Sequence, residues 1–580
     1  MKKLLGAYRV FTPDKFTIFG LGIGTVVFCL AGWLLGTHTI PFIALLVVAG
    51  IFSSFDIMCD FFVFQGIFAK DFNFGLLVNS YKGAGLLKMG VITDQLRRLI
   101  QTAIVLSVTG MIVYPGVVAG GNFTDPAGYA AFLATLILTV YTGNTITLNF
   151  SRKYSNYMEG ILVIGLFTAL DILLALGVIG IFTKNEAVDA WPLLLVLVSF
   201  AVVATYAMCE RVSIRFKDTF GIRTVGRFGD DSKTRMIIFL AIAYGVDILM
   251  LPIMKYGYDR GVDLSVLLVA QMMYPACGVA LAKLLSYNEG KLPKFSYILM
   301  LITGAVFMVL SALCVMVPSS LEVNGVNFEL YYYFANFIAM ASSVIMIIAI
   351  IASGKEKREN AGYRFKKPGK AILFMLLFFV LYFTLQIISI LFTVIMGQAE
   401  MSIFADYFSS LFAPGMVSMW LNVLISLPLT FVIFLGEEYG WRYYLQPIMQ
   451  KKFGVALGTV LLGIAWGVWH AGADFMYYSS ETGIQMFIGQ IIACISLAIY
   501  MGYAYMKTEN IWVPVVIHYF NNNLAVLLSG KVGTEGLQGK VVTWDALPVY
   551  VIAYSVMWLF ILTPTMRGKI SKNSGEKEND

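Results

Sequence analysis

Apolar runs of about 20 residues, separated by short polar connections, make up most of the chain. A run of this length can cross the hydrocarbon core of a bilayer as a helix, because a helix satisfies its own backbone hydrogen bonds. We count about sixteen such runs and predict an all-α, polytopic integral membrane protein of the cell membrane. The predicted spans begin near Phe16, Ile40, Leu99, Ala127, Tyr157, Ala190, Met236, Leu264, Ser296, Tyr331, Ala371, Leu421, Val455, Ile484, Ile511 and Ala546.

Composition excludes the soluble globular class. Of the 580 residues, 59% are hydrophobic and 13% are charged, whereas soluble domains have roughly 25% charged residues.

The six cysteines stand singly and form no C-x-x-C pair, so we predict neither a disulfide framework nor a thiolate metal site.

Basic residues indicate how the chain is oriented. When the seventeen connections and ends are assigned alternately to two sides, one side receives 36 of the 41 Lys and Arg residues and the other receives 5. Because basic residues favour the cytoplasmic side, we predict that both termini are cytoplasmic. The net charge of +7 then reflects topology and contact with membrane lipid, and gives no reason to expect a nucleic-acid partner.

Two basic connections, residues 209–235 and 354–370, are candidate boundaries between bundles. We predict a six-helix membrane domain in residues 1–235, followed by additional helices with a basic cytoplasmic linker in residues 236–370. A membrane core that could carry chemistry then occupies residues 371–565, and residues 566–580 form a polar cytoplasmic tail.

The connection from Gln65 to Arg98 mixes apolar and basic residues, which is typical of an amphipathic helix on the cytoplasmic face. The N-terminal part has six predicted spans, with this amphipathic helix between the second span and the third. This arrangement resembles the permease subunit of a type-2 ABC exporter. That resemblance implies a separate ABC ATPase subunit, because the chain has no G-x-x-x-x-G-K-[ST] motif. The alternative is an interfacial helix that only anchors the bundle. The residues in this connection whose pattern is similar to that of the exporter's cytoplasmic helix are Ser80, Lys82, Gly83, Leu86, Leu87, Lys88, Gln95 and Arg97.

Acidic residues also occur inside the N-terminal spans, at Asp56, Asp60 and Asp171, with Asp247 just beyond. They favour hydrogen bonding between helices. Lining a substrate path is the alternative.

The C-terminal part contains Glu437, Glu438 and Arg442 inside an apolar run. A charge near the bilayer centre costs at least about 2.5 to 3.5 kcal/mol, so such groups are usually paired and functional. On a helix, Glu438 and Arg442 share one face at i and i+4. Glu437 is turned about 100° away. We therefore predict a structural ion pair between Glu438 and Arg442, with Glu437 left to accept a proton.

Two later apolar runs carry histidines. His470 ends a run with two G-x-x-x-G pairs, whose small residues allow close helix packing. His518 and Asn522 are four residues apart and share a helix face. At about 1.5 Å per residue, these side chains and Glu437 all fall near the middle of the membrane, so the three runs can converge there.

The order E-E-x-x-x-R, aromatic-x-x-x-His and His-x-x-x-Asn resembles the CPBP family of CAAX prenyl proteases and bacteriocin-processing enzymes. This resemblance implies an intramembrane glutamic endopeptidase. In it, Glu437 and His470 would activate water, and His518 and Asn522 would form the oxyanion hole. Trp466 departs from the family's usual phenylalanine. No cofactor is expected, but Glu437, His470 and His518 also suit zinc, which leaves a metal-dependent variant as the alternative.

We therefore predict hydrolysis of a membrane-embedded or lipophilic peptide substrate, coupled to export or maturation of a secreted peptide or bacteriocin. The alternative is a non-proteolytic ABC exporter permease or bacteriocin-immunity component.

Overall fold

The structure is a computed structural model that describes residues 24–34, 41–68, 84–121, 123, 125–149, 157–184, 189–219, 230–285, 291–317, 320–323, 326–397, 400–411, 414–528 and 537–568. The chain forms two compact units. One comprises residues 1–231 with 316–318, and the other comprises 232–315 with 319–580. Their division lies near the predicted boundary at residue 235. Residues 236–565, apart from 316–318, belong to one unit.

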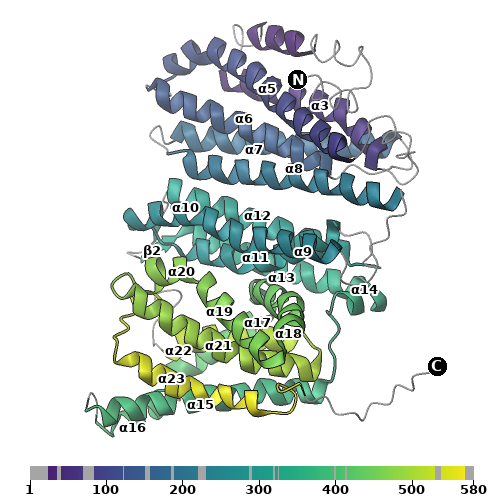
Figure 1. The fold of residues 1–580 in the computed structure, drawn as a ribbon. Coiled ribbons are helices and arrows are strands. Elements are labelled where there is room, and N and C mark those ends of the chain that lie inside the picture. Colours follow the sequence, from purple (N-terminus) through teal and green to yellow (C-terminus); the bar gives the residue numbers. More distant parts are fainter. Residues whose placement is uncertain are drawn as a thin grey trace, which may run out of the picture. The chain divides into compact units, whose positions relative to one another are not determined.

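The N-terminal unit is a helical bundle in which α6 contacts α3, α5, α7 and α8 (Figure 1). A further helix covers Gly24–Leu34. The labelled helices are α3 (Pro41–Phe68), α5 (Ala84–Ala119), α6 (Pro126–Asn149), α7 (Tyr157–Lys184) and α8 (Trp191–Thr219).

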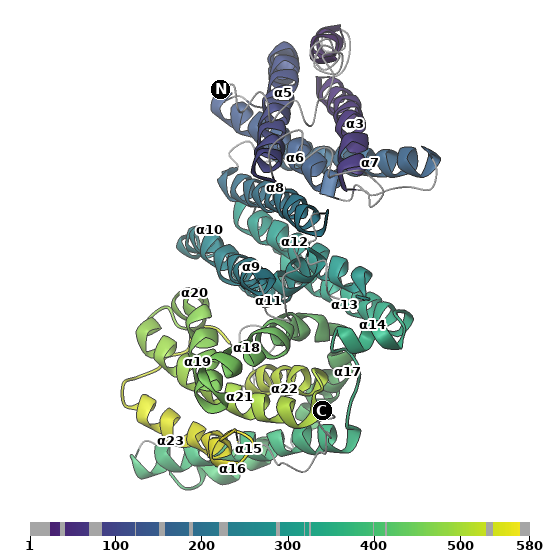
Figure 2. The same ribbon diagram turned by 45° about the vertical axis from the view of Figure 1, so that its right-hand side comes forward.

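The C-terminal unit is also built from helices, with one short antiparallel hairpin that pairs Ser320 with Glu329. In Figure 2, α19 and α21 lie side by side, and α22 lies near α17. The elements are α9 (Asp230–Leu240), η1 (Ala241–Val246), α10 (Asp247–Asp259), α11 (Ser265–Leu285), α12 (Lys294–Met316), β1 (Ser320–Val323), β2 (Val326–Glu329), α13 (Leu330–Ala352), α14 (Lys355–Asn360), α15 (Pro368–Ile395), α16 (Ile403–Leu411), α17 (Pro414–Glu438), η2 (Tyr439–Leu445), α18 (Gln446–Phe453), α19 (Val455–Trp469), α20 (Ala471–Ala473), η3 (Asp474–Tyr478), α21 (Gly483–Thr508), α22 (Trp512–Leu528), α23 (Ala546–Trp558) and η5 (Leu559–Leu562).

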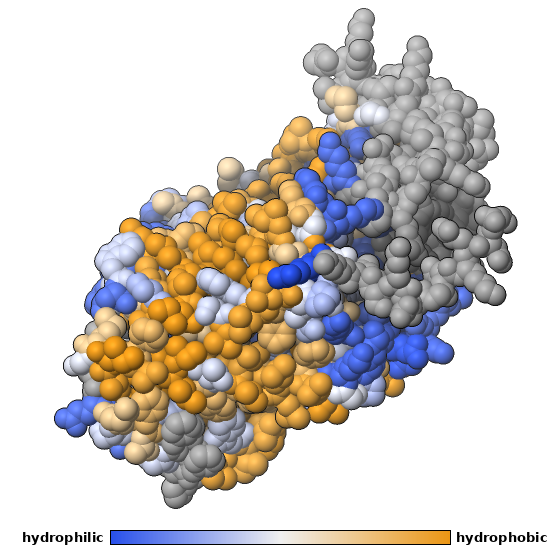
Figure 3. Space-filling view, turned by 60° about the horizontal axis from the view of Figure 1, so that its bottom comes forward, coloured by the Kyte–Doolittle hydropathy of each residue, from blue (hydrophilic) through white to orange (hydrophobic). Residues whose placement is uncertain are grey.

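The prediction of an all-α, multi-pass membrane protein is confirmed. Within the described residues, 12 helices are long and apolar enough to cross a membrane, and a bent pair, Val455–Trp469 with Ala471–Tyr478, makes up to 13. The other three predicted spans correspond to shorter helices, Gly24–Leu34, α22 and α23. Figure 3 shows a broad apolar surface with hydrophilic residues toward its edges, as lipid contact requires.

The connection from Gln65 to Arg98 differs from the predicted surface helix. Residues 65–68 belong to α3, residues 69–83 lie outside the described residues, and residues 84–98 are the first part of the continuous helix α5. Arg98 is fully buried and is paired with Asp56 and Asp60. Because this arginine satisfies its charge inside the bundle, its part of the helix does not need a polar surface.

Close packing through small residues, predicted from the G-x-x-x-G pairs, is confirmed for α19. A Cβ atom on Gly463 would lie 2.5 Å from Ile495 Cα, and one on Gly467 would lie 2.7 Å from Ile491 Cα. The backbones of α19 and α21 can approach this closely only because both residues lack side chains. This contact holds the end of α19, and with it His470, against α21.

Candidate active site

The three predicted motifs meet in the C-terminal unit. Glu437 and Glu438 end α17, His470 follows α19, and His518 lies in α22. All four side chains are buried, with Glu437 2% exposed and Glu438 fully enclosed. Buried ionisable groups require hydrogen-bonding or charged partners, and those partners define the site.

Glu438 pairs with two basic side chains. Its Oε2 lies 3.1 Å from Arg442 Nε, and its Oε1 accepts a hydrogen bond of 3.2 Å from Arg442 Nη1. His518 Nδ1 lies 2.8 Å from the same Oε1. The Arg442 guanidinium also stands over the Trp466 ring, 4.2 Å from its centroid. This group therefore ties α17, α19 and α22 together.

Glu437 has a different partner. Trp466 Nε1 donates a hydrogen bond of 2.8 Å to Glu437 Oε2. Among the described residues, Glu437 makes no direct hydrogen bond to His470. The sequence singled out Trp466 only as a departure from phenylalanine, yet this indole supplies a donor that a phenyl ring lacks.

The histidine tautomers follow from their neighbours. His470 Nδ1 lies 2.9 Å from the Trp466 carbonyl oxygen, which can only accept, so Nδ1 carries the hydrogen. By the same argument, His518 Nδ1 donates to the carboxylate of Glu438. In a neutral ring, Nε2 is then the basic nitrogen. His470 can therefore act as a base through Nε2.

Two glycines set the position of the glutamates. A Cβ atom on Gly436 would lie 2.5 Å from Met272 O, and one on Gly440 would lie 2.2 Å from Pro275 Cβ. The motif thus packs directly on the backbone of α11. The chain then continues as the π-helix η2, a distortion that is frequent at functional sites.

A cavity of about 370 Å³ is lined by three of the four predicted catalytic residues, and Glu437 is not among its lining residues. His470, His518 and Asn522 line it, together with Trp466, the partner of Glu437. Its size lies within the usual range of ligand pockets, about 300 to 1,000 Å³. A second cavity of about 390 Å³ is lined by Lys355, Arg358 and Arg364 without an acidic or histidine residue, so it lacks a general base.

Three polar residues at the site were not predicted. Asn521 and Lys540 line the cavity. Burial lowers the pKa of the Lys540 ammonium, whereas the nearby Asp474 carboxylate raises it. Asp474 is fully buried one turn after His470, and neither of its carboxylate oxygens has a hydrogen-bond partner in the described part of the chain. Lys540 lies in the connection between α22 and α23, outside the three motifs, so no sequence spacing links it to them.

The residues proposed for zinc do not form a metal site in this arrangement. Among the residues that the structure describes, no group of three His, Cys, Asp or Glu side chains could hold a metal ion.

The region around this site resembles a known family. Residues 418–524 match the family described as Type II CAAX prenyl endopeptidase Rce1-like. The chain is thus similar to this family over part of its C-terminal unit. The matched residues include both glutamates, both histidines and Asn522.

The chain is also similar to curated proteins, at low sequence identity. Lysostaphin resistance protein A from Staphylococcus aureus strains Newman, USA300 and COL is 25% identical over 193 residues, which cover 32% of this chain and 42% of that protein. The chain therefore aligns with less than half the length of these relatives. No solved structure matches the chain significantly. The resemblance of residues 1–235 to an exporter permease stays a prediction, since the Rce1-like match begins at residue 418.

Proposed function

We propose that the C-terminal unit is an intramembrane glutamic endopeptidase that hydrolyses a membrane-embedded or lipophilic peptide. The main support is the gathering of His470, His518 and Asn522 around one cavity, next to the Glu437–Trp466 pair. The Rce1-like match over the same residues agrees with this chemistry.

In the proposed reaction, water attacks the carbonyl carbon of the scissile peptide bond. The Glu437 carboxylate takes up the proton that this water loses, as the general base, while His470 Nε2 accepts a hydrogen bond from the same water and orients it. Collapse of the tetrahedral intermediate breaks the C–N bond, and the same proton passes to the leaving amine. The products are a carboxylic acid and an amine, so atoms and protons balance without a cofactor.

His518 and Asn522 would stabilise the oxyanion. Asn522 Oδ1 accepts a hydrogen bond of 3.1 Å from Asn521, which leaves the Asn522 amide nitrogen as the donor toward the oxyanion. His518 donates through Nε2 when both ring nitrogens carry hydrogen, and the adjacent Glu438 carboxylate stabilises that charged ring. Fixed donors of this kind lower the barrier because they are oriented before charge develops.

The test is cleavage by the full-length protein in lipid. Wild type and His470→Ala are incubated with a prenylated CAAX peptide and with its unprenylated form, each with and without chelator, and products are identified by mass spectrometry. We expect wild type to cleave the lipidated peptide, His470→Ala to be inactive and chelator to have no effect. Equal cleavage by both proteins would overturn the proposal, and loss with chelator would favour a metal-dependent mechanism.

Trp466→Phe is expected to reduce kcat by about tenfold or more with little change in KM. A phenyl ring preserves packing but cannot donate to Glu437, and a hydrogen bond to a charged group contributes about 1.5 to 3 kcal/mol. Steady-state kinetics on the peptide cleaved by wild type measure this change. An unchanged kcat would show that the indole is not needed to orient Glu437.

We also propose that the two units act together in maturation or export of a secreted peptide, such as a bacteriocin, with a separate ABC ATPase as a partner. Support comes from the presence of a second membrane bundle in the same chain.

A further inference from the structure

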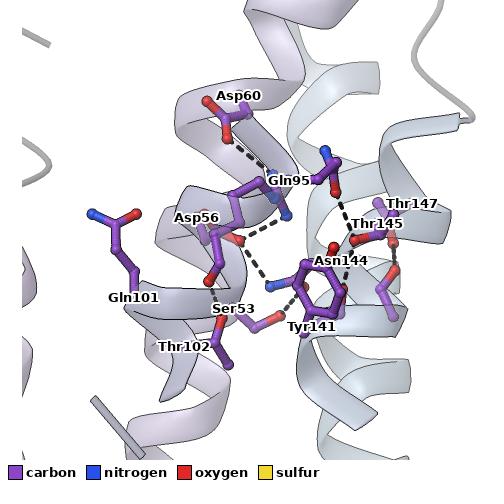
Figure 4. A network of polar contacts seen from close by, with 12 residues as sticks. Ser53, Asp56, Asp60, Gln95, Gln101, Thr102, Tyr141, Asn144, Thr145 and Thr147 are labelled. Carbon is purple, nitrogen blue, oxygen red and sulfur yellow. Dashed lines mark hydrogen bonds and ion pairs between the residues drawn. The ribbon is translucent and has the colours of Figure 1, made fainter. Parts of the chain in front are cut away.

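A buried polar network crosses the N-terminal unit, far in sequence from the candidate active site (Figure 4). Two arginines of α5 pair with three carboxylates. Arg98 lies 2.7 Å from Asp56 and 3.0 Å from Asp60, and Arg97 pairs with Asp60 and with Asp94. All three carboxylates are at most 2% exposed.

The fourth buried carboxyl, Asp171 of α7, is joined to this network by a chain of hydrogen bonds. The amide nitrogen of Asn144 lies 3.1 Å from Asp56 Oδ2. The amide oxygen of the same residue lies 2.6 Å from Ser53 Oγ. Ser53 Oγ also lies 2.6 Å from Asp171 Oδ2. Figure 4 shows the part of this chain from Asp56 through Asn144 to Ser53.

Counting hydrogens shows that the chain holds an additional proton. The two contacts of Ser53, at 2.6 Å, are shorter than two oxygens can approach without a shared hydrogen. At the Asp56–Asn144 contact of 3.1 Å, a carboxylate oxygen and an amide oxygen would repel each other without one. Each of the three contacts therefore needs one hydrogen. The Ser53 hydroxyl supplies one, and the Asn144 amide supplies one from its nitrogen end. The third hydrogen must come from a carboxyl group.

We infer that the N-terminal unit binds one proton in the chain Asp56–Asn144–Ser53–Asp171. The count does not depend on which way the Asn144 amide is oriented. In one orientation Ser53 donates to Asn144 and Asp171 donates to Ser53. In the other, Asp56 donates to Asn144 and Ser53 donates to Asp171. Rotation of the hydroxyl with a flip of the amide therefore moves the proton between the two carboxyls.

The proton resides on Asp171 in this arrangement. Asp56 faces the Arg98 guanidinium at 2.7 Å, which favours its ionised form. Asp171 Oδ1 packs against α6, where a Cβ atom on Gly143 would lie 2.0 Å away. The charged groups that act on Asp171 are Asp56 on α3 and Arg98 on α5. Asp60, Asp94 and Arg97 belong to the ion pairs around Arg98.

Infrared spectroscopy of the full-length protein in lipid tests the inference through the C=O band of a protonated carboxyl. In Asp171→Asn, the side-chain amide can donate a hydrogen bond to Ser53 in place of the protonated carboxyl. Every contact of the chain then still has a hydrogen, but no additional proton is bound. We expect this variant to lose one protonated-carboxyl band relative to wild type at neutral pH. Asp125→Asn, at an exposed helix start in the same unit, is the control and should keep the band. Retention of the band in Asp171→Asn would overturn the inference.

A second variant and a second measurement keep the test decisive if Asp171→Asn folds poorly. Ser53→Ala removes the hydroxyl to which Asp171 donates, so the band should move to higher frequency. Above about pH 4 the unfolded chain releases the proton that the folded wild type still holds. The stability of wild type should therefore fall with rising pH from there until the folded protein also loses the proton. Asp171→Asn should lack this fall, as measured by thermal unfolding over a pH series that begins at about 4 and ends in the alkaline range. An unmoved band in Ser53→Ala, or parallel stability curves, would contradict the bound proton.

Discussion

Glu437→Gln is expected to abolish peptide cleavage while the protein folds and inserts normally. Glutamine has the shape of glutamate, and its carbonyl oxygen can still accept the hydrogen bond from Trp466 Nε1 that Glu437 Oε2 accepts at 2.8 Å. It cannot take a proton from water. General acid–base catalysis contributes about 10² to 10⁴ in rate, so kcat should fall by at least about 100-fold. Mass-spectrometric rates of product formation in lipid measure the loss.

The matched control is Glu481→Gln, which makes the same chemical change at an exposed position of the same unit. This variant should keep the wild-type rate. If Glu437→Gln retained more than about a tenth of wild-type kcat, the carboxylate would not be the general base.

Arg442→Met is expected to destabilise the C-terminal unit by about 3 to 5 kcal/mol. Arg442 and Glu438 are both fully buried and are 3.1 Å apart. Methionine keeps much of the side-chain volume but leaves the Glu438 carboxylate without its main counter-charge, and breaking a buried ion pair in this way costs about that amount. Denaturant or thermal unfolding of the full-length protein in detergent measures the change.

The control for charge loss is Arg364→Met, because Arg364 pairs with Glu359 at 2.9 Å at an exposed site. An exposed pair contributes about 0 to 1 kcal/mol, so this variant should unfold almost as wild type does. The double variant Glu438→Gln and Arg442→Met removes both charges and should be less destabilised than Arg442→Met alone. Equal destabilisation of the single and double variants would mean that Arg442 acts through packing rather than through its charge.

Much of the architecture was predictable because it depends on local pattern. Each apolar run long enough to cross a bilayer became a helix, and the glycine spacing in α19 correctly predicted close packing, with Gly463 and Gly467 against Ile495 and Ile491. Helix periodicity is a property of neighbouring residues, so it can be read from the sequence. The length of each helix was less predictable. The basic segment that ends at Arg98 joined a span, because distant Asp56 and Asp60 supply its counter-charges.

The candidate site was predictable in its membership and less so in its contacts. Glu437, His470, His518 and Asn522 stood out because polar groups are rare within apolar runs. Their partners could not be assigned in this way. Trp466 bonds to Glu437, the Trp466 carbonyl accepts from His470, and His518 bonds to Glu438 rather than to Glu437.

By itself, the sequence determined that this is a multi-pass helical membrane protein, and it identified the polar residues that its interior must accommodate. Burial of a charge in lipid is so costly that each such residue indicates a site. Only the tertiary structure decided which of these residues are bonded to one another. Hydrogen bonds act over about 3 Å. Helix packing brings side chains from distant parts of the chain within that distance, as it does for Ser53 and Asp171, which are 118 positions apart.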